Sequence, residues 1–456
     1  MPDDAALAVR EARATTESYA YRTPMKFGGR VVTDVVVLNC EVRLEEGSGR
    51  SAWGQGSMTV GSAWAWPSKI LSSEETTAAM VALGERIAQK AGVERWVGHP
   101  LETSLHVRSQ LVAWASEIAR EQALVEPMPE LAALVAYSPF DAALLDAYGK
   151  LRGRSTFALV ADSSPAEWLA SHLDGSFAGE SPSQYVTAQP RESLPLYHLV
   201  GALDPLVPSD VTTQPGDDLP VTLGQWIERD GLTHLKIKLA GDDLAWDVER
   251  TVAVDRVASE SAADRREALR YSLDFNERCE NVDYVLAFLR QVEERSPAAF
   301  ARTQYLEQPT HRDLKRFGTA MHAAAAIKPV VIDESLIDYE SLLLAREQGY
   351  SGVALKACKG LAESILLASA AQKYGMFLCV QDLTCVGRSL LQSIALAAHL
   401  PTVAAIEGNG RQYCPQGNAA WRSTFPDLMQ PVAGRVASGR LTLAGVGYGD
   451  LPHSSG

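Results

Sequence analysis

The sequence predicts an α/β fold: a (β/α)7β TIM-like barrel with an α+β capping domain formed by the N-terminal region and the C-terminal tail. Eight short apolar runs alternate with helix-like segments between residues 194 and 410, which is typical of a closed parallel barrel. Strand-like runs followed by helix-like segments fill residues 1–150, as in an α+β unit. Residues 411–456 return to Gly-rich, strand-like sequence that we expect to pack on the N-terminal sheet.

Composition excludes several classes of protein. With 456 residues, 46% of them apolar, the chain can form two or three domains with large cores. Its net charge of −14 and the lack of a basic run argue against nucleic acid as a partner. No apolar run reaches the ~18 residues that a membrane span needs, so we expect no membrane partner.

The cysteine pattern and the first residues indicate the compartment. Six cysteines are spread along the chain without a CxxC pair, which argues against a disulfide scaffold or a zinc knuckle. The first residues, MPDDAALAVR, are acidic and lack the apolar centre of a signal peptide. We therefore expect a reducing, cytoplasmic setting.

The N-terminal region reads as an antiparallel sheet followed by helices. β-branched residues recur along residues 6–46, and a Gly/Ser turn separates them from another short run at 51–60. A helix with a serine cap starts near Ser73 and is expected to end at Gly92. Further helices, with apolar residues at i, i+3, i+4 and i+7, are predicted as far as Tyr148.

Two segments beside these strands, Tyr19–Gly29 and Met58–Trp66, are rich in aromatic and small residues. We interpret them as loops that either close over a ligand or form ordinary surface. Residues 161–193, rich in Ser, Pro and Gly, read as an insertion or linker that could lengthen the cap or serve a subunit interface. The expected domains are a capping domain at 1–160, the insertion at 161–193, the catalytic barrel at 194–410 and a tail at 411–456 packing on the capping domain.

The eight barrel strands are read from apolar runs that end in polar residues. In chain order they are LPLYHLVGAL, LTHLKIKLA, YSLDFNE, TQYLEQP, PVVIDES, GVALKACKG, MFLCVQD and TVAAIEGN. The helix-like segments between them include HRDLKRFGTAMHAAA at 311–325. Because catalytic groups of such barrels lie at the carboxyl ends of the strands, the candidate functional residues are those that end these runs.

Lys236 and Lys238 lie two apart in the second run, so their side chains project from the same face of a strand. Two adjacent ammonium groups repel each other, and burial lowers the pKa of a lysine further, which makes such a lysine a usable base near neutral pH. A bare Lys-x-Lys pair also suits a solvated edge strand. The residues that follow favour the catalytic interpretation.

Three acidic residues, Asp274, Glu307 and Asp333, end the third, fourth and fifth runs. Their spacing is about one β/α unit each time, so the three side chains should enter one barrel mouth from neighbouring strands. Buried carboxylates are costly without partners, and three of them suit an octahedral hard cation, Mg²⁺ or Mn²⁺. Any one alone could be a helix cap or a surface acid, but three in register favour a metal site.

Lys356 ends the sixth run, across the mouth from Lys238. A cation between two lysines fits removal of the proton next to a substrate carboxylate. One lysine takes the proton, the cation and Lys236 stabilise the enediolate, and the second lysine delivers a proton to the opposite face or holds charge.

At these motifs the chain resembles the enolase superfamily, specifically the mandelate racemase/muconate lactonizing enzyme family. LKIK, LDFNE, YLEQP, VIDES and ALKACKG carry the resemblance, in order and at family-like spacing. It extends to PFDAALLDAYGK, similar to the helix that closes the family's capping domain, and to GRLTLAGVGYGD in the tail, and it covers most of the chain outside about 160–193. A lysine at the end of the sixth strand is similar to the muconate lactonizing enzyme subgroup, whereas the mandelate racemase subgroup uses a histidine on the seventh strand. Here the seventh run ends Val380-Gln381-Asp382, without a histidine.

The resemblance implies a role for each of three lysines: Lys238 as base, Lys236 as its electrostatic neighbour and Lys356 as the opposing acid or base. It implies three ligands for Mg²⁺, or for Mn²⁺ in its place: Asp274, Glu307 and Asp333. The candidate substrate contacts are Asn276, Asp382, Glu407 and Asn409.

Two features depart from the family's pattern. Lys359-Gly360 stands where the family has a double glycine after the sixth-strand lysine. The eighth run ends Glu407-Gly408-Asn409 and lacks the Asp-x-Asp with which dipeptide epimerases capture a substrate ammonium, which speaks against a dipeptide substrate. Three histidines in or beside helices are expected to be structural: His311, His322 and His399.

The expected function is a Mg²⁺-dependent enzyme that abstracts the proton α to a carboxylate of a small-molecule substrate. It is a racemase/epimerase or a cycloisomerase, with an acid-sugar or hydroxy-acid dehydratase as the alternative. A non-catalytic binding or assembly protein on the same barrel is a second class, against which the retained lysines and carboxylates argue. We also expect a homo-oligomer.

Overall fold

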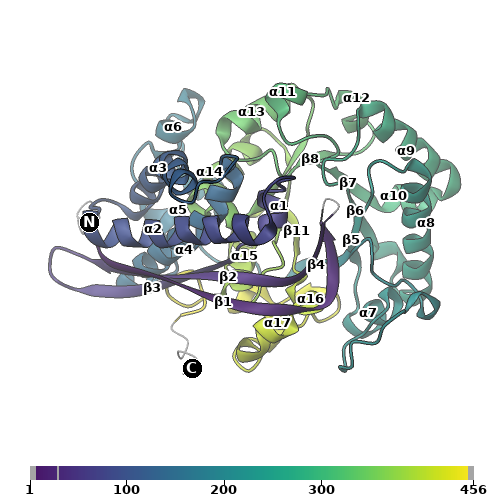
Figure 1. Cartoon of the computed structure of the whole chain (residues 1–456), viewed down its shortest axis with the longest axis horizontal. Coiled ribbons are helices and arrows are strands. Elements are labelled where there is room, and N and C mark those ends of the chain that lie inside the picture. The colour runs from purple at the N-terminus through teal and green to yellow at the C-terminus, as the bar shows by residue number, and fades with distance from the viewer. Residues whose placement is uncertain (1–6, 28–29, 450–456) are drawn as a thin grey trace.

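The computed structural model describes residues 7–27 and 30–449. Figure 1 shows two units side by side: a small antiparallel sheet with its helices, and a ring of short strands surrounded by helices. Among the described residues, no helix combines the length and the apolar character that crossing a bilayer requires.

The cap sheet has three antiparallel strands in the order β1-β2-β3: β1 (Ala8–Phe27), β2 (Arg30–Glu45) and β3 (Ser51–Thr59). The predicted loop at Tyr19–Gly29 is therefore wrong for most of its length, because β1 stays paired with β2 up to Phe27. Gly28 and Gly29 lie outside the described residues. The second predicted loop is divided between the end of β3 and the short helix α1 (Ser62–Ala65).

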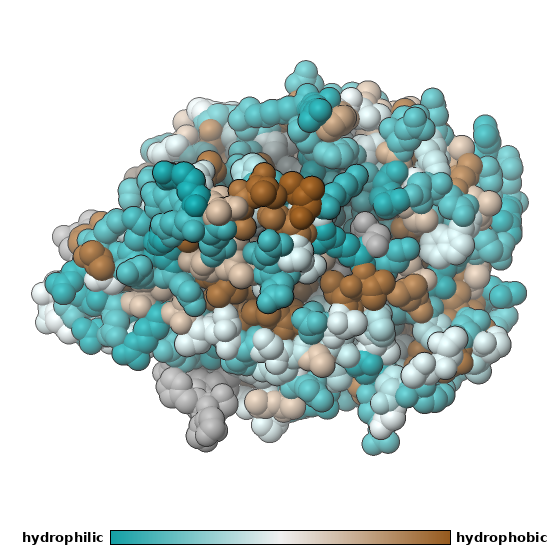
Figure 2. Space-filling view, viewed as in Figure 1, coloured by the Kyte–Doolittle hydropathy of each residue, from teal (hydrophilic) through white to brown (hydrophobic). Residues whose placement is uncertain are grey.

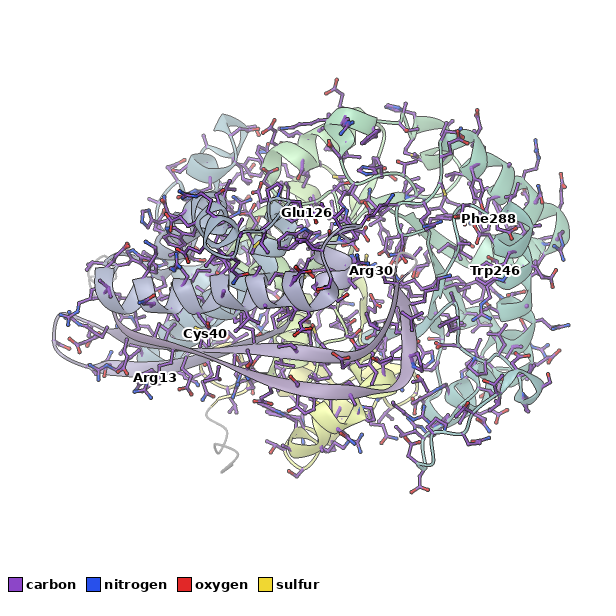
Figure 3. The ribbon with its side chains drawn as sticks, in the orientation of Figure 1. Arg13, Arg30, Cys40, Glu126, Trp246 and Phe288 are labelled. Atoms are coloured by element: carbon purple, nitrogen blue, oxygen red, sulfur yellow. The ribbon has the colours of Figure 1, made fainter. Side chains whose placement is uncertain are left out.

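An irregular pairing shapes the barrel end of this hairpin. Ala20 pairs with Asp34 and Met25 with Val32, so the four residues between Ala20 and Met25 face a single residue of β2. Such a bulge bends and twists a strand. In Figure 3, Arg30 lies at the end of the hairpin beside the barrel, and Arg13 lies near the opposite end of the sheet.

Of three long helices, α2 (Ser73–Glu94) and α4 (Glu130–Arg152) pack on the sheet, and α3 (Pro100–Glu121) packs on these two helices. Ser72 and Glu75 form a capping box at the start of α2, which runs past the expected end at Gly92. Helix α4 lies directly on β3, since a Cβ added at Gly54 would stand 2.0 Å from the carbonyl oxygen of Ala143. Glycine is required there by the close approach of two backbones.

Eight parallel strands form the barrel, which confirms the predicted fold class. They are β4 (Leu194–Val200), β5 (His234–Lys238), β6 (Arg270–Asp274), β7 (Thr303–Glu307), β8 (Val330–Ile332), β9 (Gly352–Lys356), β10 (Phe377–Gln381) and β11 (Val403–Glu407). β11 closes the ring on β4, with Ile406 opposite Leu196 and Glu407 opposite Tyr197.

The longer helices surround the barrel in chain order. They are α7 (Leu223–Asp230), α8 (Leu244–Ser261), α9 (Val282–Arg295), α13 (Tyr339–Glu347), α14 (Leu361–Lys373) and α15 (Arg388–His399). Shorter helices connect or follow them: α10 (Pro297–Arg302), α11 (Leu314–Phe317), α12 (His322–Ala325), α16 (Gly410–Tyr413) and α17 (Pro426–Met429).

The single helix predicted at 311–325 is wrong, because α11 ends at Phe317 and α12 begins at His322. The side-chain amide of Gln348 donates to the carbonyl of Leu314 at 2.9 Å. A continuing helix would use that carbonyl for the N–H of Gly318. Glycine is also a weak helix former, so the break falls there.

Residues 161–193 pack along the outer layer of the barrel. Helices α5 (Thr156–Ser163) and α6 (Trp168–His172) are followed by two short turns. Backbone N–H groups of Thr187 and Arg191 then donate to the carbonyls of His399 and Ala398, both at 2.9 Å.

The tail forms less strand than predicted. Among the described residues after 410, the strand is β12 (Arg435–Val436), and it pairs antiparallel with β4 and not with the N-terminal sheet. Gly445, Gly447 and Gly449 have left-handed backbone conformations, which interrupt strand structure in the rest of the tail. The tail does reach the cap, since the Tyr448 hydroxyl donates to the Gln55 carbonyl at 2.7 Å. Residues 450–456 lie outside the described residues.

The close contact of α4 with β3 predicts that a side chain at position 54 destabilises the fold, whereas one at an open glycine does not. Gly54→Ala should lower the free energy of unfolding by about 2 kcal/mol or more, because the added methyl overlaps helix backbone. Gly47→Ala is the matched control, since nothing lies within 4 Å of a Cβ there. Urea unfolding followed by circular dichroism measures both; equal stability of the two variants would contradict the packing described.

Candidate active site

Strand register brings the predicted residues to one level of the barrel mouth. Lys238 of β5 pairs with Asp274 of β6, and Asp274 pairs with Glu307 of β7. Paired residues of neighbouring parallel strands point to the same side of the sheet, so the three side chains meet. All three are buried.

The Lys236 ammonium is the centre of this group. Its Nζ lies 2.8 Å from Glu307 Oε1, 3.0 Å from Glu407 Oε2 and 3.2 Å from Asp274 Oδ2. Lys238 Nζ lies 2.5 Å from the same oxygen of Asp274. One buried ammonium therefore joins acids from three strands, and two lysines share one carboxylate.

Asp333, at the carboxyl end of β8, is held in a second group on the other side of the mouth. Lys356 Nζ lies 2.8 Å from Asp333 Oδ2. Lys359 Nζ lies 3.4 Å from Asp333 Oδ1 and donates to the Asp333 backbone carbonyl at 2.5 Å. The predicted catalytic lysines and predicted metal ligands thus converge, although in two lysine–acid groups.

Burial and neighbouring charges shift the pKa values of these groups. Burial disfavours the Lys236 ammonium, but Glu307, Glu407 and Asp274 outweigh it and raise the pKa of Lys236 well above its usual value. The expectation of a lowered lysine pKa is therefore wrong for Lys236. For Asp274, burial acts upward, but Lys238 and Lys236 bring its pKa below the usual range.

The mouth contains more acids than lysines. Its buried acids are Asp274, Glu307, Asp333, Glu334, Asp382 and Glu407, and its buried lysines are Lys236, Lys238, Lys356 and Lys359. Two acids are therefore in excess. Burial first, and a neighbouring carboxylate second, raise the pKa of both Glu334 and Asp382 to about 8. Protonation of these two acids balances the charge of the mouth, and a bound divalent cation would balance it in place of the two protons.

The donor set fits a hard cation, because Asp274, Glu307 and Asp333 offer carboxylate oxygens from three consecutive strands. As they stand, the described residues include no group of three or more His, Cys, Asp or Glu side chains arranged to hold a metal ion. Lysine ammonium groups lie against all three carboxylates instead. Metal binding there requires these ammonium groups to move away from the carboxylate oxygens.

Trp64 of α1 lies against the mouth from the cap side. Its indole Nε1 donates to Glu334 Oε1 at 2.8 Å, and Lys356 Nζ lies 4.2 Å from its ring centroid. Figure 2 shows apolar residues gathered near the centre of this face, around α1 and the barrel end of the hairpin, among more hydrophilic surroundings. Part of the segment Met58–Trp66 therefore reaches the site.

The bulge of β1 also lies beside the mouth. Arg22 Nε lies 2.6 Å from Asp217 Oδ2, which ties β1 to the loop before α7. A cavity of about 380 Å³ opens between this bulge, the end of β4 and α7, with Leu203 and Trp226 among its walls. This volume is that of a small-molecule pocket.

The four candidate substrate contacts occupy different surroundings. Glu407 is engaged by Lys236, and the backbone N–H of Asn276 donates to Asp274 Oδ1 at 2.9 Å. Asp382 Oδ2 accepts from the backbone N–H groups of Cys385 and Asn409. Asp382 Oδ1 and Asn409 Oδ1 are buried and have no hydrogen-bond partner. The last two residues therefore offer unpartnered polar atoms at the ends of β10 and β11.

Sequence reasoning missed four residues of the site, and Lys359, which lies against Asp333, is one of them. Gln381 accepts from Lys236 at 2.9 Å and donates to Glu307, so it orients both. Glu334 and Trp64 were also missed. Gln381 and Glu334 stand at strand ends, where the other residues were found, and could have been included. Trp64 comes from the cap and gave no signal in the barrel motifs.

The three histidines lie outside this group. The His399 ring stacks on Phe157 with centroids 4.4 Å apart, and its Nδ1 lies 2.6 Å from the Thr187 carbonyl. His311 packs on Phe317. His322 begins α12.

Comparison with known families and structures extends this picture. The model of the enolase C-terminal domain-like family matches residues 220–449, about half of the chain. No curated protein sequence matches the chain.

Solved structures with the same fold cover nearly the whole chain. N-succinyl Arg/Lys racemase from Bacillus cereus is 14% identical, with a TM-score of 0.62 over 96% of this chain and 95% of that one. Muconate lactonizing enzyme from Pseudomonas fluorescens is 16% identical, with a TM-score of 0.60 over 97% and 96%. An enolase from Bradyrhizobium, solved with magnesium and mandelic acid, is 14% identical, with a TM-score of 0.60 over 98% and 96%.

The raised pKa of Asp382 predicts a pH dependence of stability. An acid with pKa about 8 in the folded chain and about 3.9 unfolded binds more protons when folded. The unfolding free energy should therefore fall by about 1.4 kcal/mol per pH unit from this group as pH rises from 5 to 7. Thermal unfolding in chelator measures it, and Asp382→Asn should flatten the slope. A wild-type slope unchanged by Asp382→Asn would contradict this.

Proposed function

Since the chain belongs to the enolase superfamily, within the mandelate racemase/muconate lactonizing enzyme family, we propose that it abstracts the proton α to a substrate carboxylate through an enediolate intermediate. The outcome is racemisation, epimerisation or cycloisomerisation. The observation that carries this proposal is that Lys238 from β5, against Asp274, and Lys356 from β9, against Asp333, enter one barrel mouth from opposite sides. The racemase and the lactonizing enzyme named above share this fold, which supports an isomerase.

The ligands we assign to Mg²⁺, or to Mn²⁺ in its place, are Asp274, Glu307 and Asp333. When bound, the ion supplies positive charge that stabilises the enediolate. The excess of two acids in the mouth supports this assignment, and so does the magnesium in the Bradyrhizobium neighbour.

The lysines divide the proton chemistry between them. Lys238 Nζ is the atom to which we assign the substrate proton. Lys236 stays an ammonium, because the carboxylates around it raise its pKa. It therefore attracts the substrate carboxylate and the developing enediolate charge. Lys356, on the other side of the mouth, is placed to serve the opposite face of the α-carbon.

The cap excludes water from this chemistry. Trp64 lies over Lys356, and its indole N–H fixes Glu334. Desolvation strengthens each electrostatic interaction inside the mouth. The unpartnered Asn409 Oδ1 is an acceptor, so the substrate we propose carries a hydrogen-bond donor, a hydroxyl or an ammonium, beyond its carboxylate.

One observation favours the alternative, a dehydratase of an acid sugar or hydroxy acid. Glu334 has a pKa of about 8, so it is a neutral acid at pH 7, and its Oε2 has no hydrogen-bond partner. A neutral carboxylic acid can protonate a leaving hydroxyl. The same enediolate then loses water in place of regaining a proton.

Exchange of the substrate α-proton tests the base. A library of chiral α-substituted carboxylates incubated with the chain and Mg²⁺ in D₂O is expected to include one that gains one mass unit. Lys238→Ala should slow this exchange by about 10² to 10⁴-fold, as expected for loss of a general base. Lys373→Ala, an α14 surface lysine paired with Glu180, should leave it unchanged. Undiminished exchange in Lys238→Ala would make the base assignment wrong.

The products of the same screen separate the two outcomes. An isomerase changes optical rotation or forms a ring while the substrate mass changes only by deuterium. A dehydratase releases a product lighter by one water, and Glu334→Gln should slow only that reaction. No turnover of any acid, with or without Mg²⁺, would favour a non-catalytic binding protein.

Removal of the metal tests the ligand assignment. Chelation with EDTA should abolish turnover, and Mg²⁺ or Mn²⁺ should restore it. Asp274→Asn should weaken Mg²⁺ binding measured by titration calorimetry at least about tenfold, because it removes a charged ligand. Asp162→Asn, which changes an exposed acid paired with Arg154, is the control and should bind as the wild type does. Full activity in EDTA would contradict the proposed metal dependence.

A further inference from the structure

Lys359 is a buried lysine to which the proposed chemistry gives no role. It ends a short turn (Ala357–Lys359) after β9. Its ammonium lies 3.4 Å from Asp333 Oδ1 and donates to the Asp333 backbone carbonyl at 2.5 Å. The Lys356 ammonium lies 2.8 Å from the other oxygen, Oδ2. Each oxygen of the Asp333 carboxylate therefore has an ammonium group beside it.

The cap encloses this ammonium. Lys359 is 1% exposed. The next turn is held by α4, where Asp141 accepts from the N–H of Leu361. A Cβ at Gly360 would meet the Tyr137 ring at 3.1 Å. On the other side, the Trp64 ring centroid lies 5.8 Å from Lys359 Nζ. Lys359 thus cannot turn into solvent as a surface lysine would.

We propose that Lys359 is a fixed internal cation that opposes the divalent metal at Asp333 and so sets the metal affinity of the site. The proposal rests on the proposed function, since it takes Asp333 as a metal ligand. Two positive centres beside one carboxylate repel each other, and the repulsion is far stronger in a buried mouth than in water. At Asp333 the lysine also donates to the backbone carbonyl, which anchors the charge.

The proposal is tested by removing the positive charge of Lys359 while keeping its hydrogen bond to the Asp333 carbonyl. Lys359→Gln retains an N–H donor for the Asp333 carbonyl but removes the positive charge. Titration calorimetry of the metal-stripped full chain with Mg²⁺, without substrate, should give a dissociation constant at least about tenfold lower than that of the wild type. Lys359→Arg keeps the charge and should stay within about threefold of the wild type. Lys373→Gln, which removes a surface charge from α14, should change nothing.

Unchanged or weaker Mg²⁺ binding by Lys359→Gln overturns the proposal. A Lys359→Arg variant whose Mg²⁺ dissociation constant falls as much as that of Lys359→Gln overturns it too. If Lys359→Gln lacks the wild-type circular dichroism spectrum, Lys359→Gly repeats the measurement without a side chain to pack. The rise in thermal midpoint on adding Mg²⁺ then serves as the second readout, and it should exceed that of the wild type. A wild-type chain that binds no Mg²⁺, or an Asp333→Asn variant that binds it equally well, contradicts the proposed metal site and this proposal with it.

Discussion

The pairing of buried charges at the barrel mouth is the interaction on which the rest of the structure depends. An unpaired charge in such a place costs several kcal/mol, so each carboxylate needs a cationic or hydrogen-bonding partner from another strand. Lys236 supplies that partner for Glu307, Glu407 and Asp274 at once. This is possible only if β5, β6, β7 and β11 are in the observed register and the ring is closed.

The cap completes the electrostatic arrangement. Helix α4 lies on β3 through Gly54 and holds the turn after β9 through Asp141, so one helix joins the cap sheet to the turn that carries Lys359. Trp64 covers Lys356 from the same side and binds Glu334. The cap is therefore part of the site as well as a cover, because it keeps water from screening the charges.

The arrangement assigns different work to lysines that look alike in the sequence. Lys236 is surrounded by carboxylates and remains charged, whereas Lys238 lies against Asp274 and is 6% exposed. Lys356 and Lys359 both contact Asp333, but only Lys359 is fixed to a backbone carbonyl. The mouth holds more buried acids than lysines. Neighbouring carboxylates help to raise the pKa values of Glu334 and Asp382, and the same surplus of acids supports the proposed cation.

The sequence by itself determined the barrel, because strand-to-helix alternation and the polar residues ending each run are local patterns. It also determined the set Lys236, Lys238, Asp274, Glu307, Asp333 and Lys356, since strand ends of a parallel barrel must meet. Only the tertiary structure decided which lysine contacts which acid, that the pKa of Lys236 rises, and that Trp64 and Gln381 take part. It also decided that β1 is paired to Phe27 and that the helix at 311–325 is broken. These depend on contacts between residues far apart in the chain, such as Gln348 with Leu314, and no local pattern specifies such contacts.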